Sequence, residues 1–150
     1  MVWALEEVHT DLADGRARAR ADIMCGAFDD ALVMGWEPLV DGIVLPDADD
    51  RHVVAAAQRG RADLIVTANL ADFPSDVLDL LCIEVQSPDV FLVNQLDLDP
   101  DRVVAVLYEQ AAATRNPSIT FDQVLHQLSR CGVPEFAKLA HQQRWRALNG

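Results

Sequence analysis

The chain has 150 residues, 51% of them hydrophobic, and 24 acidic against 12 basic side chains give it a formal net charge of −12. The length fits one domain with an adequate core, and the composition is that of a globular chain rather than a disordered one. The acidic balance argues against a protein that binds nucleic acid through a basic surface alone, although bound divalent cations can reverse the local field.

No secretory signal and no stretch of about 20 apolar residues is visible, so we expect a soluble, cytoplasmic protein without a membrane segment. Three cysteines, at positions 25, 82 and 131, show no zinc-binding spacing. Their odd number and wide separation favour buried free thiols in a reducing compartment.

The first part of the chain combines an apolar helical pattern with a small basic cluster. Residues 1–12 place apolar side chains at helical spacing, and no hydrophobic strand precedes them. Arg16, Arg18 and Arg20 follow at a spacing of two, which does not build one helical face. They are either part of a solvated connector or contacts for a phosphate backbone. A short strand is predicted at Ala31–Trp36.

The stretch Leu45–Phe73 organises the rest of the chain. It begins with a run of acids that ends at Asp50, and acids stabilise the positive end of a helix. The helix is predicted to end at Gly60, which we expect in the left-handed conformation that favours glycine. Leu64–Val66 is short, apolar and rich in β-formers, as in a strand of a parallel sheet covered on both faces.

Polar residues follow that strand directly. Thr67, Asn69 and Asp72 lie at its carboxyl end, the edge at which open parallel sheets bind ligands. Asp50, at a helix start, is expected to face the same crevice. Each residue alone is ordinarily a cap or a turn residue. Together, oxygen ligands without cysteine or histidine favour a hard cation such as Mg²⁺ or Mn²⁺.

The segment after this stretch alternates short elements with clear helix starts. A short helix is predicted over Asp76–Leu81 and a strand over Cys82–Val85. Ser87 is the expected N-cap of the next helix, with proline at its first position. Asp99 repeats that signal, and the helix that it starts is predicted to end near Arg115.

From residue 116 the pattern is purely helical. Thr120 begins an amphipathic helix that Gly132 ends, and Pro134 begins a last helix, so the pattern predicts a helical hairpin. We therefore expect two parts, an α/β domain over 1–115 and a C-terminal helical appendage over 116–150.

The central and following segments resemble one known family. The segments that carry this resemblance are DDRHVVAAA from Asp49, LIVTANLADFP from Leu64, Cys82–Val85, Ser87–Leu92 and Leu96–Pro100. Together they are similar to the second half of a PIN domain. PIN domains are metal-dependent ribonucleases, and many, the VapC-like ones, are toxins of toxin–antitoxin pairs.

The resemblance implies a PIN-like parallel sheet flanked by helices. The family normally opens with a strand that ends in an aspartate, and no counterpart is visible here, so we expect a PIN fold that is truncated at its N-terminus and carries a C-terminal helical hairpin. Glu7, with Glu6 in reserve, matches the family's glutamate. Its metal is Mg²⁺ or Mn²⁺.

The site residues implied by the resemblance have distinct roles. Glu7, Asp50 and Asp72 are expected to be catalytic; Asp50, Asn69, Asp72 and Glu7 to bind the metal; Thr67 to support a ligand; and Arg51, Arg16 and Arg18 to contact RNA.

The function implied is hydrolysis of RNA phosphodiesters by a toxin that also binds an antitoxin protein and forms a homodimer. Two alternatives to this function stay open. The first is a catalytically impaired PIN remnant that acts as a protein-binding module, and the second is a phospho-acceptor receiver domain. The latter normally needs a lysine beside its acids, and Lys138 lies in the final helix.

Overall fold

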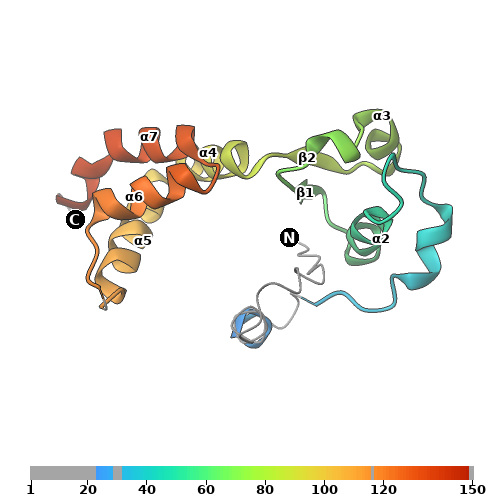
Figure 1. The fold of residues 1–150 in the computed structure, drawn as a ribbon, viewed down its shortest axis with the longest axis horizontal. Helices are drawn as coiled ribbons and strands as arrows, with labels where there is room; N and C mark the ends of the chain where they lie inside the picture. The colour runs from blue at the N-terminus through green and yellow to red at the C-terminus, as the bar shows by residue number, and fades with distance from the viewer. Residues whose placement is uncertain (1–22, 29–31, 116, 149–150) are drawn as a thin grey trace. The chain divides into compact units, whose positions relative to one another are not determined.

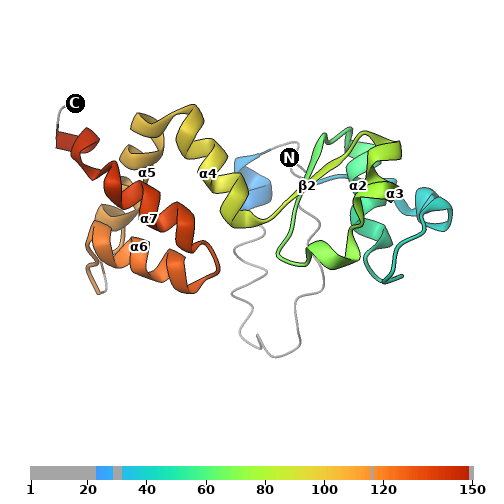
Figure 2. The ribbon, with the colours of Figure 1, turned by 90° about the horizontal axis from the view of Figure 1, so that it is seen from above.

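The structure, a computed structural model, describes residues 23–28, 32–115 and 117–148. The chain divides into two compact units, one formed by residues up to Ile65 with Asn69–Val85 and the other by Val66–Ala68 with residues from Gln86 onward (Figures 1 and 2). None of the helices in the described part combines the length and apolar character needed to cross a membrane.

The elements from residue 37 to residue 86 are η1 (Glu37–Gly42), α2 (Arg51–Gly60), β1 (Leu64–Val66), η2 (Leu70–Asp72), α3 (Ser75–Leu78), η3 (Asp79–Leu81) and β2 (Glu84–Gln86). Those that follow are α4 (Pro88–Leu98), α5 (Pro100–Ala113), α6 (Phe121–Arg130), α7 (Pro134–Gln142) and η4 (Arg144–Leu148).

In the part of the chain that the structure describes, β1 and β2 form a two-stranded sheet. The backbone N–H of Glu84 donates to the carbonyl of Asp63 at 2.9 Å, and the N–H of Thr67 donates to the carbonyl of Gln86 at 3.0 Å. Both strands advance in the same direction through these two bonds, so the pair is parallel. A parallel sheet among helices confirms the predicted α/β class and agrees with a PIN-like fold.

Helix α2 forms as predicted and supplies much of the first core. Val54 and Ala55 are fully buried, and they pack in one cluster with Ile65 of β1 and Leu78 of α3. Alanines on this face let the helix backbone lie close to the sheet, which larger side chains would prevent. The packing fixes where α2 begins, and the acids at its start are placed with it.

The end of α2 differs from the prediction in one residue. Gly60 is the last helical residue, and the left-handed conformation lies at Arg61, with φ of 53°. The N–H of Ala62 donates to the carbonyl of Ala57 at 2.9 Å, a closure that requires the residue between Gly60 and Ala62 to be left-handed. The expectation that Gly60 takes that conformation is therefore wrong.

Three other predicted elements shift. Residues 32–36 form no strand, and Gly35 is there in a positive-φ conformation of 73°. The helix expected over Asp76–Leu81 is divided into α3 and η3. Cys82 adopts φ of 56°, which ends η3 and delays the strand to Glu84.

In the second unit, the predicted hairpin of α6 and α7 is confirmed (Figure 2). It shares one core with the two preceding helices, in which Leu96 of α4, Val104 of α5 and Phe136 of α7 are buried together. The ring of Tyr108 also stacks on Phe121, with centroids 4.2 Å apart. The expected division into 1–115 and 116–150 falls between α5 and α6, and it stays a prediction.

Helix starts in this unit follow the predicted local signals. The Ser87 hydroxyl accepts from the N–H of Val90 at 3.2 Å, and the Asp99 carboxylate accepts from the N–H of Arg102 at 3.0 Å. Thr120 forms a reciprocal capping box at the start of α6. These bonds satisfy N–H groups that a helix leaves without internal partners.

A different kind of cap begins α7. The carboxylate of Asp89, in the first turn of α4, accepts from the N–H groups of Phe136 at 2.8 Å and Glu135 at 3.1 Å. These two bonds join residues that are 46 and 47 positions apart in the sequence. The N-cap residue of α7 itself, Val133, makes no side-chain hydrogen bond to the helix backbone. Asp89 thereby ties the start of α4 to the start of the last helix.

The cysteines are free, as predicted, but they are not buried. Cys82 and Cys131 are exposed, and Cys25 is half-buried. Cys82 and Cys131 both lie where a helical segment ends, so their side chains are turned out of the core by the chain reversal.

Removal of the Asp89 carboxylate tests the long-range cap. Asp89→Ala should lower the free energy of unfolding by about 1–2 kcal/mol, because it leaves two helix N–H groups without partners. Urea unfolding followed by circular dichroism measures the change. Asp97→Asn, an exposed acid in the last turn of the same helix, should leave stability unchanged or slightly raised. Equal losses in both variants would contradict the cap.

The positive φ of Cys82 gives a second test. Cys82→Gly should raise the free energy of unfolding by about 0.5–1 kcal/mol, since glycine takes this conformation without steric cost. The same substitution at Cys131, where φ is −84°, should leave stability unchanged or lower it. Thermal melts of the two variants side by side measure the difference, and a loss in Cys82→Gly would show that its side chain has a packing role.

Candidate metal centre

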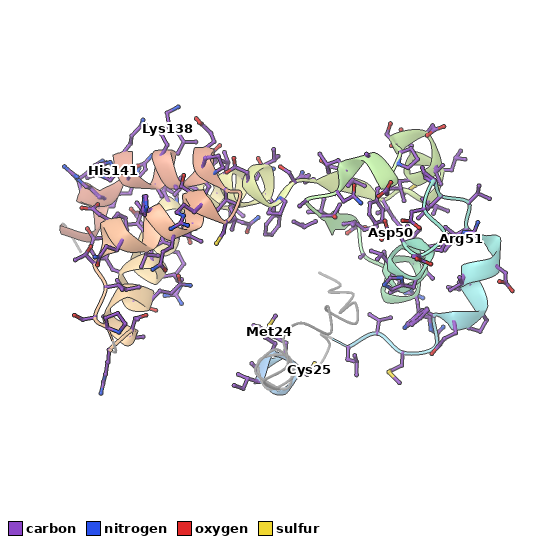
Figure 3. All side chains as sticks on the ribbon, in the orientation of Figure 1. Met24, Cys25, Asp50, Arg51, Lys138 and His141 are labelled. Atoms are coloured by element: carbon purple, nitrogen blue, oxygen red, sulfur yellow. The ribbon has the colours of Figure 1, made fainter. Side chains whose placement is uncertain are left out.

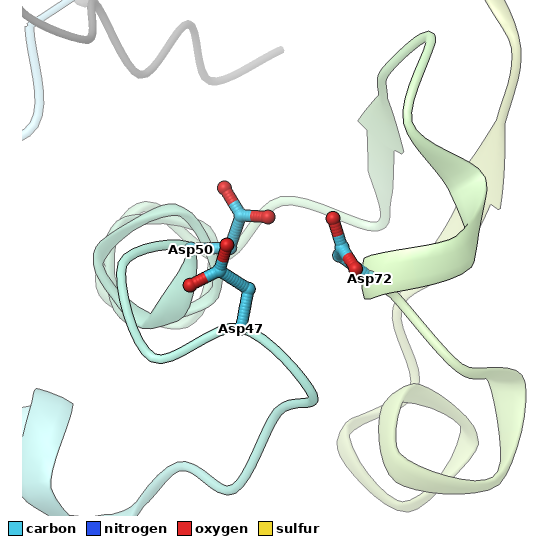
Figure 4. Close-up of side chains that lie close together, drawn as sticks. All are labelled: Asp47, Asp50 and Asp72. Atoms are coloured by element: carbon cyan, nitrogen blue, oxygen red, sulfur yellow. The ribbon is translucent and has the colours of Figure 1, made fainter.

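Three carboxylates gather in the first unit. Asp47 and Asp50 precede α2, and Asp72 ends η2; each offers an oxygen within 4.8 Å of the others. In Figure 4 the carboxylate of Asp72 faces those of Asp47 and Asp50 from the opposite side. Asp47 is exposed, and the other two are half-buried, so the centre is open to solvent.

Asp50 stands at the N-cap of α2, yet its side chain accepts no hydrogen bond from the helix backbone. The first turn is closed by the main chain, where the N–H of Val53 donates to the carbonyl of Asp50 at 3.0 Å. The carboxylate is therefore not used as a cap, the role that an aspartate at a helix start commonly has. It is directed toward the other acids (Figure 4).

Asp47 is held by a turn of the backbone. The N–H of Asp49 donates to its Oδ1 at 2.9 Å. The Nδ1 of His52 donates in turn to the carbonyl of Asp49 at 2.5 Å, and the His52 ring lies 6.0 Å from that of Trp36. Sequence reasoning did not assign Asp47 to the site. Its spacing of three residues from Asp50 in one acidic turn is the signal that would have found it.

Asp72 reaches the centre from the segment after β1. The side-chain amide of Asn69 donates to its Oδ2. A hydrogen bond to one carboxylate oxygen fixes the orientation of the group and leaves the other oxygen for a ligand. In this geometry Asn69 positions Asp72; its predicted role as a metal ligand stays a prediction.

The donor set decides what the centre can hold. Carboxylate oxygens alone, with no sulfur or imidazole among them, suit a hard divalent cation that keeps several waters, such as Mg²⁺ or Mn²⁺. Residues 1–85 carry 17 acidic and 6 basic side chains, so the centre lies in a strongly negative part of the chain. Such a field attracts cations and repels a phosphate until a cation is bound. The residues fit the metal that the sequence predicts.

The other predicted site residues are not among the three clustered carboxylates. Thr67 follows β1, and its backbone N–H donates to the carbonyl of Gln86. Arg51 is the first residue of α2, half-buried, and its Nε is enclosed without a hydrogen-bond partner. The roles of Thr67 beside the metal and of Arg51 toward RNA stay predictions. Glu7, Arg16 and Arg18 lie outside the described residues.

Two comparisons relate the chain to known proteins. Residues 88–142 match the VapC50 C-terminal domain family. Over 93 residues, the chain is 43% identical to the protein named "Putative ribonuclease VapC50" from Mycobacterium tuberculosis (strain ATCC 25618 / H37Rv). That alignment covers 62% of the chain and 54% of the relative, so the chain spans about half the length of the relative. No solved structure matches the chain significantly.

Metal binding is measurable on the purified protein. Mn²⁺ should raise its melting temperature, with a Kd on the order of a millimolar because three partly exposed carboxylates are its protein ligands. Asp50→Asn and Asp72→Asn should each remove most of this shift. Asp49→Asn, an exposed acid of the same turn outside the cluster, should keep it. An equal shift in all four proteins would place the ion elsewhere.

Proposed function

Because the chain is a VapC-like member of the PIN family, we propose that it is a metal-dependent ribonuclease, with Mg²⁺ or Mn²⁺ held by Asp47, Asp50 and Asp72. The observation that carries this proposal is the approach of three carboxylates within 4.8 Å at the start of α2 and the end of η2. A relative that is 43% identical over the aligned part has ribonuclease in its name, which supports the same activity.

A divalent cation, when bound, supplies an activated water and neutralises charge on the phosphate. The protein's own part is to bind and to orient. Asp50 and Asp72 approach the metal position from two separate segments, so the ion is held only when those segments are packed together. Asn69 keeps the Asp72 carboxylate in one orientation through its amide. No serine, cysteine or histidine is needed as a nucleophile in this mechanism.

The proposed function includes a substrate, two partners and further site residues. RNA is the substrate, an antitoxin protein and a second copy of the chain are the partners, and the cytoplasm is the compartment. Thr67 supports a metal ligand, and Glu7 adds a further acid. Contacts from Arg51, Arg16 and Arg18 to the phosphate backbone offset part of the repulsion between acidic protein and RNA.

The proposed activity predicts metal-dependent cleavage. With Mn²⁺ the purified chain should cut an unstructured RNA, and EDTA should stop the reaction. Asp50→Asn should lower the rate by two to three decades, equivalent to about 3–4 kcal/mol of barrier, since it removes a metal ligand. A fluorescently labelled oligonucleotide resolved by gel electrophoresis gives the rate.

Asp49→Asn serves as the matched control, because it removes the same charge from the same turn without touching the cluster; its rate should equal that of the wild type. Cleavage that persists in EDTA and in Asp50→Asn would contradict a metal-dependent mechanism. A folded chain that binds Mn²⁺ and cuts no RNA would favour the alternative, a PIN remnant that acts by binding protein.

A further inference from the structure

We propose that the segment from Lys138 to Arg146, along α7 and η4, is a second contact site for RNA, one that binds a single strand. In this site a base stacks on Trp145 and phosphates meet the cations beside it. The proposal takes from the proposed function only that the substrate is RNA. It does not depend on the acidic centre, which belongs to the other unit.

Charge along the chain is strongly segregated. Residues 120–150 carry four basic and two acidic side chains, a net charge of +2, whereas the preceding residues carry a net charge of −14. Net charge therefore favours a phosphate chain at the C-terminal end over the rest of the protein.

Three basic residues repeat every third position along this end. Lys138 and His141 project from the same side of α7 (Figure 3), and Arg144 follows at the start of η4. The Arg144 guanidinium donates to the Nε2 of His141 at 2.9 Å, which places the two side chains together. Residues three apart on a helix share a face, so the three groups follow one line.

Two acids lie near this line, and they leave Arg144 without a carboxylate partner. Glu135 pairs with Lys138 at 3.0 Å, and the Asp122 carboxylate lies 3.5 Å from His141. Among the described residues, no carboxylate lies within 4.0 Å of Arg144, which is exposed. Arg144 is thus the cation of this group most available to a phosphate.

Trp145 supplies the apolar part of the site. Its residue surface is 51% exposed, an unusual position for the largest aromatic side chain. The guanidinium of Arg146 lies over the ring, 4.7 Å from the centroid. Arg146 is itself held by the Asp101 carboxylate at 2.8 Å and the Gln143 amide oxygen at 2.6 Å. The indole is therefore supported by a fixed cation while half of its surface faces solvent.

This combination fits a single strand better than an acidic protein surface. An exposed indole offers a π-face to any base, and adjacent guanidinium and ammonium groups follow a backbone of phosphates. A duplex presents stacked bases whose faces an indole cannot reach. An acidic polypeptide would contact the cations but would have no base to stack on the indole. Loss of Trp145 should therefore weaken the binding of RNA and not that of an acidic polypeptide.

The test is binding of a fluorescein-labelled 12-nucleotide oligouridine to the full chain by anisotropy, in EDTA so that no RNA is cut. Trp145→Ala should weaken binding about tenfold or more, and Trp145→Phe should keep most of the affinity. Arg144→Ala should reduce the slope of log K against log salt by about 0.7, the value for one phosphate contact on a single strand. Circular dichroism confirms that each variant is folded.

One variant in the other unit serves as the control. Arg59→Ala, which removes the same charge as Arg144→Ala, should leave the affinity near that of the wild type. Failure of RNA cleavage would leave these binding results intact. The proposal is overturned if Trp145→Ala binds oligouridine as tightly as the wild type, or if poly-glutamate of equal charge competes as well as oligouridine does.

Discussion

The parallel pairing of β1 with β2 is the constraint from which the acidic centre follows. Because the two strands run in the same direction, the chain leaves β1 at the carboxyl edge and must turn through η2 and α3 before it returns. Asp72 lies in that turn. Alanines of α2 pack in the same core as Ile65 of β1, so Asp50 at the start of the helix is fixed relative to the same strand. The positions of Asp50 and Asp72 therefore both depend on the pairing of β1 with β2.

The centre brings three like-charged groups together. Three carboxylates within 4.8 Å repel one another, and the surrounding part of the chain adds negative charge. Proteins accept such arrangements at sites that bind ions, since the ion reverses the sign of the interaction. Asp50 belongs to this cluster and is not a cap of its own helix, since its side chain accepts no hydrogen bond from the helix backbone.

The two units differ in the surface that they offer to the RNA substrate that we propose. The first unit is rich in acids and would repel phosphate without a bound cation, whereas the helical unit ends in cations and an exposed indole. Asp89 matters to the second of these, because its carboxylate fixes the start of α7, the helix that carries Lys138 and His141. The cap thereby connects the folding of the helical unit to the surface that we propose for RNA.

The sequence by itself determined the local features. Ser87 and Asp99 were predicted as helix caps and are caps, and Thr120, predicted to begin a helix, caps it. Such bonds span only three residues and depend on nothing else. The strand at Leu64–Val66 and the pairing of helices near the C-terminus were likewise evident from periodicity. Only the tertiary structure decided that Asp89 caps a helix 46 residues away. It also placed the left-handed residue at Arg61 rather than at glycine. In each case the deciding interaction joins groups that folding brings together, or follows from how the core fixes the backbone, and neither is encoded in the residue's own neighbours.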